Sequence, residues 1–107
     1  MASAWLYLIV AAFLETGWAI GLEYSEGFTN LWPSIATVIS MAISVILLAK
    51  AVQSLPIGTA YAVWTGIGAA GTALLGIILF NESSSVARLG FIGLIVVGVV
   101  GLEITGH

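Results

Sequence analysis

The chain has 107 residues, of which 61% are hydrophobic and only 7% are charged, with a mean hydropathy of +1.20 and a formal net charge of −3. Soluble domains carry about 25% charged residues, so this composition indicates an integral membrane protein. With only two basic side chains there is no basic patch, which excludes nucleic acid as a partner. The absence of cysteine excludes disulfides, thiolate metal sites and cysteine nucleophiles.

Four apolar segments are long enough to cross a bilayer, which takes about 20 residues of helix. They cover residues 4–22, 32–50, 58–80 and 86–103, and short polar stretches separate them. The sequence therefore predicts an all-α integral membrane protein, with a single four-helix domain over residues 1–107 that is surrounded by the lipid bilayer. The first segment is expected to be a membrane helix and not a signal peptide, because its apolar run is too long and lacks a basic flank.

The first segment contains one charge, Glu15, which lies near its centre. A carboxylate at that depth costs at least about 2.5–3.5 kcal/mol, so an intramembrane acid is by default a functional site. A neutralising packing partner is the alternative, but the two basic residues, Lys50 and Arg88, lie near segment ends. Glu15 is therefore predicted to bind protons and a cation. Trp18 follows at i+3 on the same helix face, where it can give an indole N–H to the carboxylate or a ring face to the cation.

The second segment carries hydroxyl residues on one side. Ser34, Thr37, Ser40 and Ser44 fall within about a third of a turn of one another at helical spacing. A packing face for a neighbouring helix accounts for Ser34 and Thr37, because small hydroxyl residues let membrane helices approach. Ser44 lies near mid-depth, where its hydroxyl can reach Glu15 and help to fix the geometry of the carboxylate.

The third segment carries Tyr61 and Trp64 at i and i+3, so both rings share one helix face. Both side chains have a polar group that normally finds a partner when buried. An interfacial aromatic belt is the alternative explanation for Tyr61, whereas Trp64 lies deeper. The phenol and the indole are predicted to orient the Glu15 carboxylate or to contact the cation.

The same segment contains the pattern G-x-G-x-x-G at Gly66, Gly68 and Gly71. No strand precedes this pattern and no acidic residue follows at the required distance, so it does not indicate dinucleotide binding. Glycines inside a membrane helix permit close packing or bending. Both roles stay open, and flexibility of this helix would suit a transporter that must change which side is open.

A stripe of small residues follows in the fourth segment. Ala87, Gly90, Gly98 and Gly101 lie within roughly 80° on a helical wheel, with Leu94 between them. Such a stripe predicts a helix–helix interface. We assign it to dimerisation through Gly90, Leu94 and Gly98, and packing within one subunit is equally compatible with the sequence.

The loops carry balanced basic residues, with Lys50 on the N-terminal side of the membrane and Arg88 on the opposite side. Orientation follows the Lys/Arg bias of the loops, so this balance predicts insertion in both directions. A midplane pathway usually needs two halves of inverted topology, and a second, antiparallel copy would supply the other half.

Two Glu15 carboxylates would then share one cavity, where protons and a cation compete. Because bare carboxylates are costly in a low dielectric, only a loaded or protonated site would reorient, and an inward proton gradient would drive cation export.

Several motifs resemble those of a known family. Glu15-x-x-Trp18, residues 25–29 (SEGFT), residues 32–34 (WPS) and residues 55–68 (LPIGTAYAVWTGIG) resemble the small multidrug resistance (SMR) family over essentially the whole chain. Trp18 together with residues 64–71 (WTGIGAAG) is similar to the guanidinium-exporter (Gdx) subtype, and looks less like the polyaromatic-cation subtype.

The resemblance implies a four-helix subunit in the bacterial inner membrane, an antiparallel, dual-topology homodimer and proton-coupled export of guanidinium ion. It also implies that Glu15 is the shared proton and substrate site, and that the fourth-helix dimer contact falls on the Gly90–Gly98 region. The supporting residues it implies are Trp18, Ser44, Tyr61 and Trp64. Guanidinium suits a carboxylate site, because its planar donors pair with carboxylates in a fork. No metal, cofactor or enzymatic constellation is predicted.

Three positions depart from the family pattern. Glu23 and Glu103 stand where the family often has Lys, and Ala12 stands where many guanidinium exporters have Gly. The two acidic exchanges leave room for a subunit of a heteromeric SMR pair. An exporter of quaternary ammonium or other multidrug cations is a further alternative. A dual-topology ion channel is less compatible with the sequence, because a channel needs no central titratable acid such as Glu15.

Overall fold

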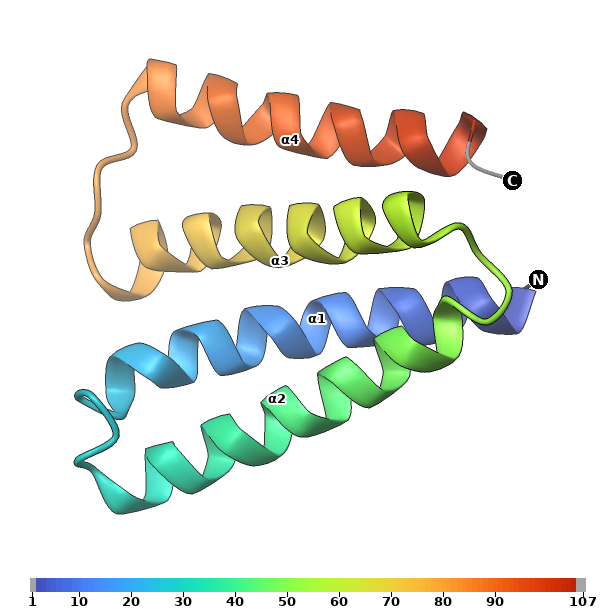
Figure 1. Cartoon of the computed structure of the whole chain (residues 1–107). Helices are drawn as coiled ribbons and strands as arrows, with labels where there is room; N and C mark the ends of the chain where they lie inside the picture. Colours follow the sequence, from blue (N-terminus) through green and yellow to red (C-terminus); the bar gives the residue numbers. More distant parts are fainter. Residues whose placement is uncertain (1, 106–107) are drawn as a thin grey trace.

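The computed structural model describes residues 2–105, which form four helices joined by short loops (Figure 1). The helices are α1 (Ala2–Tyr24), α2 (Leu31–Ala51), α3 (Ile57–Leu79) and α4 (Val86–Thr105). Each is long and apolar enough to cross a membrane, which confirms the predicted all-α class with four candidate spans. At about 1.5 Å per residue, helices of this length extend over about 30 Å or slightly more, and this matches the hydrocarbon core of a bilayer.

The helix ends differ by at most two residues from the ranges expected from the sequence. One of the two-residue differences is at the end of α1, which continues through Glu23 to Tyr24. The helix stops where Glu26, Gly27 and Phe28 take positive φ angles of 50°, 73° and 66°. Glycine reaches this region without a steric penalty, so backbone geometry at Gly27, and not the polarity of Glu23, marks the turn.

The helices lie side by side in a single layer in the order α2, α1, α3, α4 (Figure 1). The layer measures 40 × 35 × 16 Å, so its thickness is less than twice that of one helix with its side chains, about 10–12 Å. The core lies along α1, where Leu8 and Ala11 pack among buried side chains that include Val63 of α3 and Leu48 of α2. Both broad faces of the layer are therefore open.

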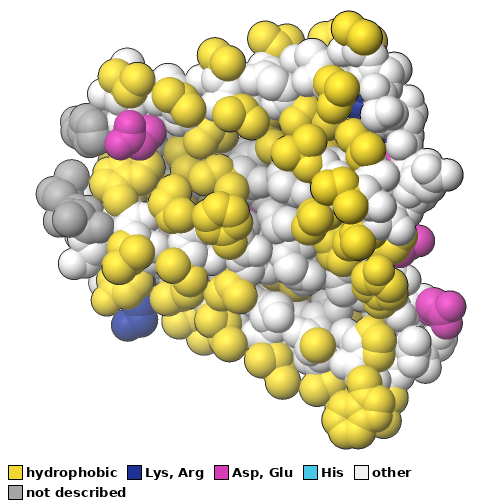
Figure 2. Space-filling model, turned by 180° about the vertical axis from the view of Figure 1, so that it is seen from behind, with side chains coloured by type: hydrophobic (Ala, Val, Ile, Leu, Met, Phe, Trp, Pro, Cys, Tyr) yellow, Lys and Arg dark blue, Asp and Glu magenta, His cyan; other side chains and the backbone are white. Residues whose placement is uncertain are grey.

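Large apolar side chains cover the open faces. Phe13, Ile78, Phe91 and Val97 are all more than three-fifths exposed. Figure 2 shows apolar side chains spread over one broad face, with charged side chains near its two ends. A soluble monomer rarely exposes contiguous apolar patches larger than a few hundred Å², so this surface fits a lipid environment or contact with a second subunit.

Candidate functional site

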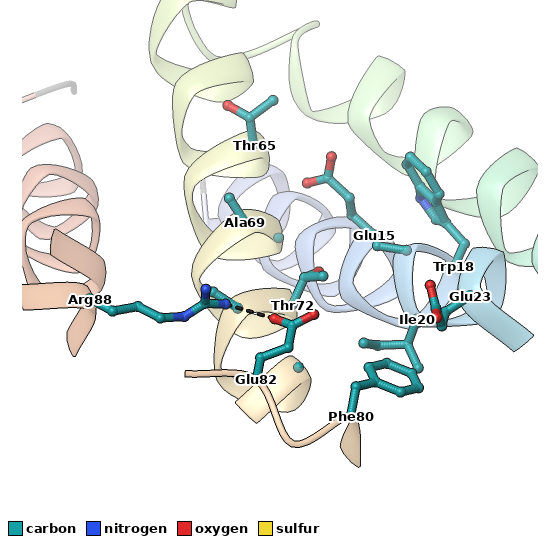
Figure 3. Close-up of a pocket in the computed structure, with 14 residues that line it drawn as sticks. Glu15, Trp18, Ile20, Glu23, Thr65, Ala69, Thr72, Phe80, Glu82 and Arg88 are labelled. Carbon is teal, nitrogen blue, oxygen red and sulfur yellow. Dashed lines mark hydrogen bonds and ion pairs between the residues drawn. The ribbon is translucent and has the colours of Figure 1, made fainter. Parts of the chain in front are cut away.

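A cavity of about 560 Å³ opens on one face of the layer between α1 and α3 (Figure 3). Glu15 and Trp18 line it from α1, and Thr72 lines it from α3. At its outer end the lining includes Glu82 and Arg88, which belong to the loop after α3 and to the start of α4. Charged and polar groups from three helices and one loop therefore converge on one cavity within the membrane-spanning layer.

Three polar atoms in this cavity have no hydrogen-bond partner in the described part of the chain. The Oε1 atom of Glu15, the indole nitrogen of Trp18 and the hydroxyl of Thr72 are buried and have no hydrogen-bond partner within residues 2–105. Figure 3 shows the Glu15 carboxyl and the Trp18 indole projecting from α1 near one another. Buried polar groups normally have partners in the protein or in bound water, so an acceptor, a donor and a hydroxyl that can both donate and accept can receive a polar ligand in this cavity.

Close contact between α1 and α3 sets the position of Glu15. A Cβ atom at Gly68 would overlap the Glu15 carboxyl group, and one at Gly71 would come within 2.6 Å of the Thr16 hydroxyl oxygen. The Thr16 hydroxyl also donates to the Gly68 carbonyl at 3.3 Å. α3 runs as one continuous helix through this region, so these glycines serve the close packing that was one of their two expected roles. Flexibility of α3 stays a prediction.

Ser44 and Trp64 form a buried hydrogen-bonded cluster beside this cavity. The Ser44 hydroxyl, which is fully buried, donates to the Ala11 carbonyl at 2.7 Å and accepts from the Trp64 indole at 3.0 Å. Ala11 lies one helical turn before Glu15, so the cluster ties α2 and α3 to the part of α1 that carries the acid. The hydroxyl is therefore directed at the α1 backbone and not at the Glu15 carboxylate.

Tyr61 extends this cluster towards the surface. Its ring lies 5.6 Å from the Trp64 ring at an interplanar angle of 53°, a geometry typical of stabilising aromatic pairs. Tyr61 is 53% exposed, and neither ring lines the Glu15 cavity of the single subunit. The structure thus divides the predicted site residues into a cavity group, Glu15 and Trp18, and an adjacent bonded group.

Sequence reasoning missed several residues of the cavity. Thr65 and Thr72 line it from α3 on either side of Gly68. Their spacing of seven residues places them on the same helix face, so a polar stripe within an apolar helix was the available signal. Glu82 and Arg88 gave no such signal, because their approach depends on how the loop after α3 folds back.

The two acidic departures from the family pattern lie in different places. Glu23 lines the outer part of the Glu15 cavity. Glu103 borders a separate, largely apolar groove of about 540 Å³ formed by α1, α3 and α4. On α4, a Cβ atom at Gly90 or Gly98 would meet nothing within 4 Å, so the small-residue stripe is uncovered within the subunit.

The model of the family described as Small Multidrug Resistance protein matches residues 3–95. The chain belongs to the small multidrug resistance family. The resemblance inferred from the motifs is thus confirmed, and this SMR chain is a multi-pass membrane protein. A guanidinium exporter of Yersinia pseudotuberculosis serotype I (strain IP32953) is 60% identical over 101 residues, covering 94% of this chain and 97% of the relative. Guanidinium exporters of Citrobacter freundii and Salmonella typhimurium are each 54% identical over 104 residues, covering 97% of this chain and 99% of the relative.

Proposed function

We propose that this SMR chain is a proton-coupled antiporter that exports guanidinium ion, with small substituted guanidines as further candidate substrates, across the bacterial inner membrane. The observation that carries the proposal is the buried, unpartnered carboxyl oxygen of Glu15 in a cavity within the membrane-spanning layer. Relatives named guanidinium exporters, 60% and 54% identical over nearly the whole chain, support the choice of cation.

Guanidinium matches the groups that this cavity presents. Its planar N–H donors pair with a carboxylate in a fork, and such charge-assisted bonds are stronger than neutral ones. The Trp18 ring can contact the flat face of the cation, and the Thr72 hydroxyl can accept a further N–H. The Ser44–Trp64 cluster holds the α1 backbone at Ala11, which fixes the direction in which Glu15 leaves the helix.

Protons and guanidinium compete for the same carboxylate in this mechanism. A protonated Glu15 offers no charge to the cation, and a cation-bound Glu15 does not take a proton. Reorientation of the empty, ionised site has the highest free energy cost, because a bare charge buried in a low-dielectric layer is strongly destabilised. Reorientation therefore occurs with a proton or with guanidinium bound, and an inward proton gradient drives export.

The functional unit in this proposal is an antiparallel homodimer. The single-layer subunit leaves the Glu15 cavity open on one face. The α4 stripe of Gly90, Leu94 and Gly98 is uncovered within the subunit, and Leu94 is 63% exposed. Small residues of this kind let two helices approach closely in a membrane. Lys50 and Arg88 lie at opposite ends of the layer, so the charge bias that would fix one orientation is balanced.

Dual insertion is tested with introduced thiols, because the natural chain contains no cysteine. Ser3→Cys and, separately, Ser83→Cys place a thiol at opposite ends of the layer. Each variant is expected to be labelled by an impermeant maleimide partly from outside the cell and fully only after permeabilisation. A thiol labelled completely from one side would rule out dual insertion, and would redirect the search to a heteromeric partner.

Substrate-evoked current in proteoliposomes tests the proposed transport reaction. A guanidinium jump is expected to evoke a proton-coupled current, whereas tetramethylammonium evokes little, because it has no N–H donors for the carboxylate fork. The control is the same preparation without protein. A current with tetramethylammonium and none with guanidinium would move the chain to the exporters of quaternary ammonium ions. Silence with both cations would contradict transport by the homomeric chain.

A further inference from the structure

An ion pair stands at the outer end of the Glu15 cavity, where the loop after α3 leads into α4 (Figure 3). The Nη2 atom of Arg88 donates to Oε1 of Glu82 at 2.7 Å. Both residues line the same cavity as Glu15. The side chain of arginine ends in a guanidinium group, which is the chemistry of the proposed substrate. The cavity therefore already contains one guanidinium group, which is the end of the Arg88 side chain and is paired with the Glu82 carboxylate.

The Glu82 carboxylate lies against Gly76 of α3. The backbone N–H of Glu82 donates to the Gly76 carbonyl at 3.3 Å. A Cβ atom at Gly76 would come within 2.5 Å of the Glu82 Oε1 atom. The missing side chain lets the carboxylate lie against α3, so Glu82 is held at the outer end of the cavity that contains Glu15.

Arg88 is poorly explained as a stabiliser of its own helix. It lies in the first turn of α4, at the positive end of the helix dipole, where a cation is unfavourable. The helix start is capped without the Arg88 side chain, because the Ser85 hydroxyl accepts a hydrogen bond from the backbone N–H of Arg88 at 3.2 Å. The ion pair itself is partly solvated, with side-chain exposures of 36% for Arg88 and 47% for Glu82. Solvated pairs of this kind contribute little stability, so a competing cation can displace one at little cost.

We propose that Arg88 is a tethered competitor of the substrate: its guanidinium group occupies Glu82, and an arriving guanidinium ion displaces it there before passing to Glu15. Glu82 is then an outer binding site for the cation. Arg88 competes for this site and so raises the guanidinium concentration that is needed to fill it. This inference rests on the proposed function, since it takes guanidinium as the transported ion.

A double-mutant cycle on the purified protein in proteoliposomes tests the inference. The KM for guanidinium is measured for the wild type, Arg88→Gln, Glu82→Gln and the double variant. Arg88→Gln is expected to lower KM about two- to fivefold, the range of a solvated ion pair. In the Glu82→Gln background the same exchange is expected to leave KM unchanged, because Arg88 then has no carboxylate to occupy. An unchanged KM in Arg88→Gln, or an equal fall in both backgrounds, overturns the inference.

Arg88→Lys separates competition by a guanidinium group from a simple effect of charge, and it serves as the second variant if Arg88→Gln does not fold. Lysine keeps the charge but lacks the planar donors, so its KM is expected to fall between those of the wild type and Arg88→Gln. A KM for guanidinium equal to that of the wild type would show that the charge alone sets the effect, and it would overturn the inference. A wild type silent with guanidinium overturns the proposed function instead.

Discussion

Replacing Glu15 with Gln is expected to reduce guanidinium-evoked current at least about 100-fold. Glutamine keeps the size and polarity of the side chain but removes the charge that the cation pairs with. Hydrogen bonds to charged groups contribute about 1.5–3 kcal/mol each, so losing a fork of two costs at least about 3 kcal/mol, or roughly two orders of magnitude in affinity. Equilibrium binding of guanidinium and current in proteoliposomes measure the loss. Proton-driven exchange disappears with it, because no other acid lies near the centre of a span.

Glu26→Gln is the matched control for this variant. It removes the same charge from an exposed position in the turn between α1 and α2, outside the cavity. Its current should stay within about twofold of the wild type, because a solvated charge far from the bound cation is screened by salt. Equal losses in the two variants would show that net charge, and not the Glu15 position, governs transport.

Gly68→Ala is expected to reduce transport about tenfold or more while the protein still folds. The added Cβ would overlap the Glu15 carboxyl and come within 2.8 Å of the Cγ atom of the same flexible side chain. Rotation of the whole Glu15 side chain relieves these contacts without moving the α1 and α3 backbones, but it takes the carboxyl out of the geometry in which it meets the cation. A displacement of about 1 Å in a reacting group can cost about 100-fold. Current and guanidinium affinity report the effect, and thermal unfolding in detergent reports folding.

Gly58→Ala is the companion variant in the same helix. A Cβ atom there meets nothing within 4 Å, so neither current nor unfolding temperature should change appreciably. The Gly68→Ala prediction fails if guanidinium affinity is retained, since the carboxyl would then tolerate the displacement. A fall in affinity together with loss of folding would instead indicate that the backbone spacing of α1 and α3 had changed.

Local patterns in the sequence predict part of the cavity lining. Glu15 and Trp18 stand out because a charge inside an apolar run, with an aromatic residue at i+3, is unusual in itself, and both residues line the cavity. Ser44 was found by its depth, but its hydroxyl was expected near Glu15, and in the structure it bonds to the Ala11 carbonyl and the Trp64 indole. Helical spacing gives the face that a side chain occupies, whereas the partner depends on how the neighbouring helices are placed.

The positions of the loop residue Glu82 and of Arg88 are harder to predict from the sequence. Nothing in the spacing of Glu82 and Arg88 shows that they border the cavity of an acid in the first helix. Their position follows from the turn after α3 and from the missing side chain at Gly76. Contacts of this kind join residues far apart in the chain, and no local pattern encodes them.

The sequence alone determined that this chain crosses a membrane through four helices, because apolar length and sparse charge leave no other way to satisfy the backbone in lipid. It also predicts Glu15 as the functional acid, because a carboxylate inside a membrane span is costly and by default marks a functional site. The tertiary structure decided the rest: the order of helices in one thin layer, the glycines that bring α3 against Glu15, and the ion pair at the mouth of the cavity. Between helices that are apolar on all sides, packing depends on side-chain shape and close approach, and hydrophobicity does not specify it.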